Sequence, residues 1–214
     1  MKKFSLIILA SIGLTLSSCF RDTVNPYPPD NNTYTFVDEF NDNRNDWAFA
    51  DQANDAYGVI DRNRGTFSFN YLDPYGIAYY RSKTINFNPD RDFVVSAKLG
   101  SDNTMGLLLG FDDARGEYGY SLTVDYDGNF ALWDEGNDNR DISAIISPTN
   151  SNAVNMNGDW NEVTIKQVGT QWKGYINGVN VFSVNAPYLY KGSVGFVIVG
   201  DTRGESDFLE ATYY

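Results

Sequence analysis

Histidine is absent from the sequence of 214 residues. Without histidine the protein cannot form a Ser-His-Asp triad, use an imidazole as a general base, or build the usual zinc ligand sets. Any catalysis would have to depend on carboxylates, tyrosine or lysine. The sequence therefore leans against an enzyme, although it leaves a carboxylate-dependent reaction open.

Cysteine occurs only once, at Cys19. The chain can therefore form no internal disulfide, and the burial of apolar side chains must hold it together. Aromatic residues can supply that apolar surface, since they make up 15% of the sequence. Such residues favour β-strands and bury large areas.

Basic residues are scarce, with 16 Lys and Arg against 28 Asp and Glu and a formal net charge of −12. No cluster of Lys or Arg reverses this sign locally. An acidic surface repels phosphate backbones, so nucleic acid is not an expected partner.

Residues 1–18 have the composition of an export signal: a basic start, an apolar stretch over 4–16, and small residues after it. The apolar stretch is shorter than the roughly 20 residues that a permanent membrane span needs. The junction LSSC, which ends in Cys19, resembles the lipobox of bacterial lipoproteins. That resemblance implies a signal peptide over 1–18 and a lipid on Cys19.

Residues 19–33 are expected to form a tether, because Pro26, Pro28 and Pro29 favour an extended segment without apolar periodicity. The lipid on Cys19 would then hold the protein at a membrane of the bacterial cell envelope. Residue 20 is Phe and not the aspartate that resembles an inner-membrane retention signal in some lipoproteins. This difference favours the outer membrane.

From residue 34 to 214, short alternating apolar runs are separated by Gly, Asn and Asp, which is typical of an antiparallel β-sandwich or barrel. Asp127-Gly128 and Asn177-Gly178 indicate tight hairpins. The pattern predicts one all-β domain of about a dozen strands and no helix. The expected strands are 34–40, 66–71, 77–87, 93–100, 105–111, 118–126, 129–135, 141–147, 160–168, 171–176, 179–184, 193–199 and 207–214.

Two of these runs indicate how the strands are covered. In 93–100 the apolar residues Phe93, Val95, Ala97 and Leu99 alternate with more polar ones, so one face of that strand should be solvated. In 105–111 both sets are apolar or glycine, which predicts a central strand that is covered on both faces.

The succession of motifs over 106–113, 118–133, 160–184 and 192–200 resembles the concanavalin A-like lectin/glucanase jelly roll and its laminin-G-like relatives. A Trp-led strand, a glycine turn, the run YINGVNV and a glycine-led strand carry most of this resemblance. It implies an antiparallel jelly roll over 34–214 whose first and last strands lie together. The fold hosts lectins, hydrolases and adhesive modules, so it predicts function poorly.

In the glucanase branch of this superfamily, one strand carries the motif E-x-D-x-x-E. This sequence contains that spacing once, in the string ESDFLE at 205–210. Glycoside hydrolysis generally needs two carboxyl groups about 5 to 10 Å apart. Asp125 and Asp127 could lie on one face of a strand, roughly 7 Å apart. Asp127, however, is part of an Asp-Gly turn, and this local role is the favoured interpretation.

Aromatic residues are the other candidates, because sugar rings stack on flat apolar faces. Trp133 should point away from the core if Phe130 and Leu132 point into it. The candidate ligand-binding residues are Trp133, Tyr80, Arg81, Tyr118 and Tyr120, with Tyr79 beside them. Half-buried sandwich residues are the alternative for each of these, and Trp47, Trp160 and Trp172 are assigned to structure.

Acidic residues cluster in two loops, over 38–46 and 134–141. Neither fits an EF-hand loop. The jelly-roll resemblance implies a possible structural calcium ion, but solvated acidic turns are the favoured interpretation, and no metal ligands are assigned.

Three hypotheses follow. The first is a non-catalytic, membrane-anchored lipoprotein that binds carbohydrate or another polymer. The second is a divergent carboxylate-dependent glycoside hydrolase. The third is a structural or protein-interaction lipoprotein of the envelope.

Overall fold

The computed structural model describes residues 33–51 and 55–214. Cys19, the signal and most of the tether lie outside these residues, so the predictions about them stay predictions. In the described part no helix is long and apolar enough to cross a membrane. Its only helical turn is the 3-10 helix η1 (Asp113–Arg115).

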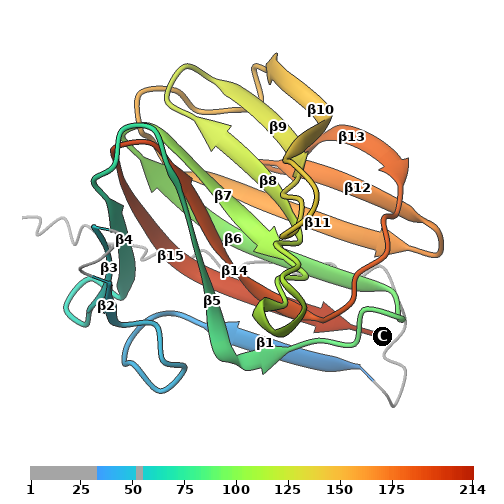
Figure 1. Cartoon of the computed structure of the whole chain (residues 1–214), viewed down its shortest axis with the longest axis horizontal. Helices are drawn as coiled ribbons and strands as arrows, with labels where there is room; N and C mark the ends of the chain where they lie inside the picture. The colour runs from blue at the N-terminus through green and yellow to red at the C-terminus, as the bar shows by residue number, and fades with distance from the viewer. Residues whose placement is uncertain (1–32, 52–54) are drawn as a thin grey trace, which may run out of the picture. The chain divides into compact units, whose positions relative to one another are not determined.

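The described residues form two antiparallel sheets (Figure 1). Sheet A has nine strands in the order β13-β12-β11-β6-β15-β4-β3-β2, with β1 also pairing with β15. Its strands are β1 (Tyr34–Asp38), β2 (Phe49–Asp51), β3 (Ala56–Asp61), β4 (Thr66–Tyr71), β6 (Phe93–Ser101), β11 (Asn161–Val168), β12 (Gln171–Ile176), β13 (Val179–Asn185) and β15 (Thr202–Tyr213).

Sheet B has six strands in the order β10-β9-β8-β7-β14-β5. They are β5 (Ile77–Asn86), β7 (Thr104–Leu109), β8 (Tyr120–Asp125), β9 (Asn129–Asp134), β10 (Ser143–Asn150) and β14 (Ser193–Val199). The all-β fold is confirmed. The first and last strands pair as expected, since Phe36 of β1 lies opposite Ala211 of β15.

The core lies between the inner faces of the two sheets. From β6 of sheet A, the alternating residues Phe93, Val95, Ala97 and Leu99 are fully buried, as period-2 pleating predicts. From β7 of sheet B, both Leu107 on the inner face and its neighbours on the other face are buried. Strand β7 is therefore covered on both sides, which confirms the prediction for 105–111.

Trp47 fills the space between the sheets at the end near β1. Its ring contacts Phe67 of sheet A at 5.3 Å and Phe196 of sheet B at 5.4 Å between ring centroids. Its indole Nε1 donates a hydrogen bond of 2.7 Å to Asp38 Oδ2. The assignment of Trp47 to structure is thus confirmed.

Strands β2 and β3 were not predicted, and β15 begins five residues earlier than expected. Strand β2 has only three residues, and several inward positions of β3 and of the start of β15 hold small residues, so the sequence shows no clear apolar alternation there. A Cβ at Gly58 would come within 2.5 Å of the Phe49 ring, and one at Gly204 within 2.5 Å of Met105 Sδ. The Phe49 ring and the Met105 side chain fill the space beside these glycines, so no large side chain marks Gly58 or Gly204 as an inward position.

Candidate functional site

The outer face of sheet B, which points away from the core, carries a pocket of about 320 Å³. Small or β-branched residues of β7, β8 and β9 form its floor, so the surface is hollowed there. Its lining residues are Ile77, Thr104, Thr123, Asp125, Asn129, Phe130, Ala131, Trp133, Glu135, Ile142, Pro148 and Val199.

Trp133 lies on this outer face because β9 alternates around it. Phe130 and Leu132 belong to the buried core, so the residue after Leu132 points the other way. The indole is half-buried and lines the pocket. Its Nε1 donates a hydrogen bond of 3.1 Å to Thr123 Oγ1 on β8, which fixes the orientation of the ring. The structure therefore places Trp133 as the sequence predicted.

Asp125 borders the pocket and organises the turn between β8 and β9. Its Oδ1 accepts hydrogen bonds from the backbone N–H groups of Asp127 (3.0 Å) and Asn129 (2.8 Å). Its Oδ2 accepts a third from Asn129 Nδ2 at 2.8 Å. The exposed Asp127 lies in the Asp-Gly turn. The turn interpretation of this carboxylate pair fits these contacts.

Glu135 is a buried carboxylate in the pocket wall, only 3% exposed. It accepts a hydrogen bond of 2.9 Å from the Tyr79 hydroxyl and another from Ser121 Oγ. Burial raises the pKa of Glu135 above its ordinary value, and these two hydrogen bonds offset part of that rise. Burial and the nearby Glu135 raise the pKa of Tyr79 in turn. Perturbed carboxyl groups in clefts are candidates for functional residues.

The raised pKa of Glu135 leads us to expect that stability depends on pH. The folded protein holds the Glu135 proton more tightly than the unfolded chain, so the free energy of unfolding falls as pH rises from about 4.5 through the folded-state pKa. Glu135→Gln removes this titration. We therefore expect the stability of Glu135→Gln relative to the wild type to increase with pH over this window. Urea unfolding at about pH 5 to 8 measures it, with the exposed Glu39→Gln as control, and a difference independent of pH would contradict it.

The other predicted residues divide between the two faces of sheet B. Tyr118 is on the outer side, where its ring stacks on Tyr79 with 5.7 Å between the ring centroids. Its hydroxyl donates a hydrogen bond of 2.8 Å to Asp138 Oδ1. Arg81 is also outer and pairs with Asp113 at 2.9 Å. Arg81 and Trp133 share one cross-strand row through β14, β7 and β8. Four strand steps separate them, about 19 Å.

Tyr80 and Tyr120 do not belong to this face, and their assignment to a platform with Trp133 is corrected. The Tyr80 ring stacks on Phe49 at 3.9 Å, and its hydroxyl donates to the backbone oxygen of Asp46. Tyr120 meets the buried Trp172 edge-on at 5.6 Å. Both rings pack against the core.

No protein-family model and no curated protein matches the chain. Solved structures share its fold. The carbohydrate-binding module CBM66 of Bacillus subtilis matches with a TM-score of 0.53 and 14% identity over 65% of this chain and 82% of the module. A structure described as a native glycosidic hydrolase matches with a TM-score of 0.51 and 12% identity over 84% of this chain and 95% of that one. The fold is a concanavalin A-like jelly roll.

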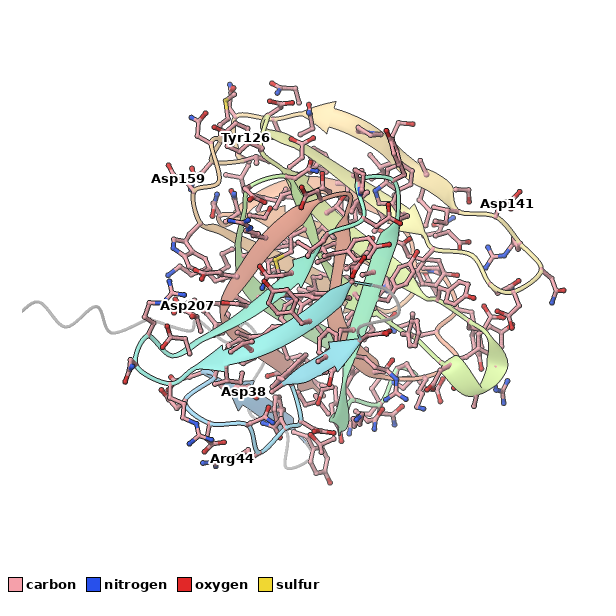
Figure 2. All side chains as sticks on the ribbon, turned by 60° about the vertical axis from the view of Figure 1, so that its left-hand side comes forward. Asp38, Arg44, Tyr126, Asp141, Asp159 and Asp207 are labelled. Carbon is pink, nitrogen blue, oxygen red and sulfur yellow. The ribbon has the colours of Figure 1, made fainter. Side chains whose placement is uncertain are left out.

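The acidic loops of this jelly roll do not gather metal ligands. Among residues 33–51 and 55–214, no group of three Asp, Glu, His or Cys could hold a metal ion. In the first loop Asp38 accepts from Trp47, Asn45 and the backbone N–H of Phe40. These contacts account for its buried carboxylate. Figure 2 shows Asp38 at the base of this loop and Arg44 extending outward.

The second acidic loop is organised in the same way. Asp134 pairs with Arg140 and accepts from the backbone N–H of Gly136. Asp138 accepts from Tyr118, while Asp141 is exposed. The contacts of the loop favour polar turns, and calcium is not established by them.

The two pocket carboxylates of the jelly roll are far apart. Glu135 bonds Ser121 at one end of β8, and Asp125 ends the same strand. Ser121 and Asp125 are four positions apart in β8, which is about 13 Å along the strand. Retaining and inverting glycosidases hold their carboxyl groups within about 5 to 9.5 Å. The pair of Asp125 and Glu135 therefore does not fit the carboxylate spacing of a glycoside hydrolase.

From the sequence, Glu135 is only a member of the acidic loop 134–141 and Tyr79 only a neighbour of the candidate residues. Tyr79 and Glu135 are 56 residues apart, and nothing local predicts their contact. The alternation of side chains in Tyr79-Tyr80-Arg81 does predict which residues share a face. Adjacent residues in a strand point to opposite sides, so Tyr80 and Arg81 cannot share a face. Tyr79 is the residue that accompanies Arg81.

Proposed function

We propose that this protein is a non-catalytic, membrane-anchored lipoprotein of the bacterial cell envelope that binds carbohydrate on the outer face of sheet B. The observation that carries the proposal is the half-buried Trp133 in the wall of a pocket of about 320 Å³. Small-molecule sites are concave and mostly apolar, with a few placed polar groups, and this pocket has that composition.

The indole of Trp133 offers a flat apolar surface on which the C–H face of a sugar ring can pack. Its hydrogen bond to Thr123 holds the ring in place, so little side-chain entropy remains to be lost on binding. Asp125, Glu135 and Asn129 surround it with oxygen atoms that can accept from sugar hydroxyls. Aromatic stacking combined with hydroxyl recognition is the chemistry of a glycan site.

The charge of the pocket favours uncharged sugars. Its lining, taken over the described residues, contains Asp125 and Glu135 but no Lys or Arg. Arg81, a basic residue on the same face, is already paired with Asp113. An acidic pocket on an acidic protein disfavours uronates and other anionic sugars.

The fold supports this proposal by analogy only. The carbohydrate-binding module of Bacillus subtilis shares the jelly roll, as does the structure described as a glycosidic hydrolase. Fold alone does not determine function, so the pocket carries the proposal. Within this pocket, the strand spacing of about 13 Å between Ser121, which bonds Glu135, and Asp125 supports the non-catalytic form of the proposal.

Membrane attachment through Cys19 is the second part of the proposal. It is supported by the export signal over 1–18 and the LSSC junction, and Phe20 favours the outer membrane. The proline-bearing tether would hold the jelly roll away from the lipid, where it could reach extracellular or periplasmic polymers.

Trp133→Ala tests the binding function. We expect it to weaken binding of a neutral glycan about 30-fold, because a central tryptophan contact is of the order of 2 kcal/mol or more. The probes are cellohexaose, xylohexaose, laminarihexaose, maltohexaose and mannohexaose, each titrated by calorimetry into the full protein. The conservative Trp133→Phe keeps a ring and should lose less.

Tyr188→Ala is the matched control, because Tyr188 is an exposed aromatic outside the pocket lining. It should bind as the wild type does. Binding that survives Trp133→Ala unchanged, or no binding of any probe, would count against the proposal. If no probe binds and one protein recurrently co-purifies, the protein-interaction hypothesis would be favoured.

A further inference from the structure

A second groove, of about 460 Å³, lies on the outer face of sheet A. It crosses the adjacent strands β4, β15 and β6 and the two loops beyond them. Its lining shares no residue with the Trp133 pocket. The lining residues are Ser68, Asn70, Gly100, Ser101, Asp102, Tyr126, Asn157, Gly158, Trp160, Arg203, Gly204 and Glu205.

The floor of this groove is set by strand register. Glu205 lies between Ser68 of β4 and Gly100 of β6. Gly100 allows Trp160 to lie close to the strand, since a Cβ there would come within 3.4 Å of the indole. The Trp160 ring is half-buried and has the Lys98 ammonium 5.3 Å from its centroid. The sequence assigned this tryptophan to structure alone, and its place in the groove was not foreseen.

Tyr126 belongs to the opposite wall and comes from the turn after β8. It is 43% exposed. Its backbone oxygen accepts a 3.0 Å hydrogen bond from Asn157 N–H, which ties the turn to the loop before β11. Asn157 and Gly158 have φ angles of 63° and 78°, so this loop bends back over Ser101. Figure 2 shows Tyr126 and Asp159 at the same margin of the molecule.

The groove contains hydrogen-bond donors that the described protein does not use. Trp133, Trp47 and Trp172 donate their indole N–H groups to Thr123, Asp38 and Gln167. The indole N–H of Trp160 has no such acceptor among residues 33–51 and 55–214. In the same described part of the chain, the Tyr126 hydroxyl, the Asn70 amide and the Arg203 guanidinium also have none. Four unpartnered donors therefore line one groove.

Acceptors and charges of both signs accompany these donors. Asp102 Oδ1 accepts a hydrogen bond of 2.7 Å from the backbone N–H of Arg203, and the second carboxylate oxygen of Asp102 is available. Glu205 is held by Arg64 and by Ser68. Arg203 lines the groove together with Asp102 and Glu205, so the lining carries charges of both signs. Aromatic surface, unpartnered donors and nearby acceptors match an uncharged polyhydroxylated ligand.

We propose that this groove on sheet A is a second binding site for neutral oligosaccharides, independent of the Trp133 pocket. A sugar ring packs against Trp160 and Tyr126, while Arg203 and Asn70 donate to its oxygens and Asp102 accepts from a hydroxyl. With sites on two sheets, one molecule can engage two segments of a polymer, and its apparent affinity for polysaccharide exceeds that for a short oligosaccharide.

The test uses the Trp133→Ala protein, so that the pocket on sheet B does not contribute. Into that background we introduce Tyr126→Ala, Arg203→Ala and Trp160→Phe in turn. The probes are again cellohexaose, xylohexaose, laminarihexaose, maltohexaose and mannohexaose. We expect Trp133→Ala to bind at least one of them. Each added change should then weaken binding about 3- to 10-fold, the size expected for one ring or one charged hydrogen bond.

Trp160→Phe distinguishes recognition from structure, because phenylalanine keeps a ring against Gly100 and removes only the N–H donor and part of the surface. Matched controls are Tyr188→Ala and Arg62→Ala, an exposed tyrosine and an exposed arginine outside the groove. Both should bind as the Trp133→Ala parent does. Urea unfolding confirms that each variant is folded.

The outcomes separate this inference from the function proposed above. Loss of all binding in Trp133→Ala, with full binding by the groove variants in the wild-type background, overturns the second site and leaves the first. Binding that depends on the groove variants and not on Trp133 supports the second site and overturns the first. If no probe binds any variant, both are overturned.

Discussion

Trp47→Ala is expected to lower the free energy of unfolding by about 3–5 kcal/mol, a large share of the roughly 5–15 kcal/mol of a typical domain. The side chain is fully buried. Its ring touches Phe67 of sheet A and Phe196 of sheet B, so removal opens a cavity between the sheets. It also leaves the buried Asp38 without one of its donors.

Urea unfolding of the described domain measures this loss. Trp160→Ala is the control, because Trp160 is half-exposed and lies on the outer face of sheet A. We expect the control to lose much less. A loss below about 1 kcal/mol for Trp47→Ala would show that the sheets do not depend on this residue.

Cys19→Ser is expected to move the protein from the membrane to the soluble fraction. Serine has no thiol to carry a lipid, and no other cysteine exists to replace it. Each buried methylene of an acyl chain contributes about 0.8 kcal/mol to membrane partition, so loss of a diacyl anchor is close to all-or-none.

Detergent phase partition and labelling with a radioactive fatty acid measure this change. Ser18→Ala is the matched control, because it keeps a small residue before the cysteine and should be lipidated as the wild type is. A Cys19→Ser protein that still enters the detergent phase would contradict the lipoprotein proposal.

Much of the fold could be predicted from side-chain alternation. The faces of β6 and the double coverage of β7 follow directly from the pattern of apolar residues. Strands β2 and β3 could not be predicted, because β2 is only three residues long and its Phe49 packs over Gly58, an inward position of β3 without a side chain. A single sequence does not show this contact between the two strands.

The candidate site could be predicted less completely. Trp133 was found because its strand neighbours Phe130 and Leu132 are plainly apolar. Tyr120 was misplaced because Tyr118 and Tyr120 have the same parity, which would put them on one face of an unbroken strand. Gly119, with a φ of 79°, interrupts the strand between them, and β8 begins only at Tyr120. A break of this kind reverses the faces without altering the pattern of residue types.

The indole N–H signals of the protein test most directly whether a glycan contacts Trp133. Trp47 and Trp172 are fully buried, so their signals serve as internal references. A ¹H–¹⁵N titration with the hexasaccharide that binds best should move the Trp133 signal, assigned with Trp133→Phe, and leave these two unchanged. A glycan that binds while the Trp133 signal stays in place would contradict the account.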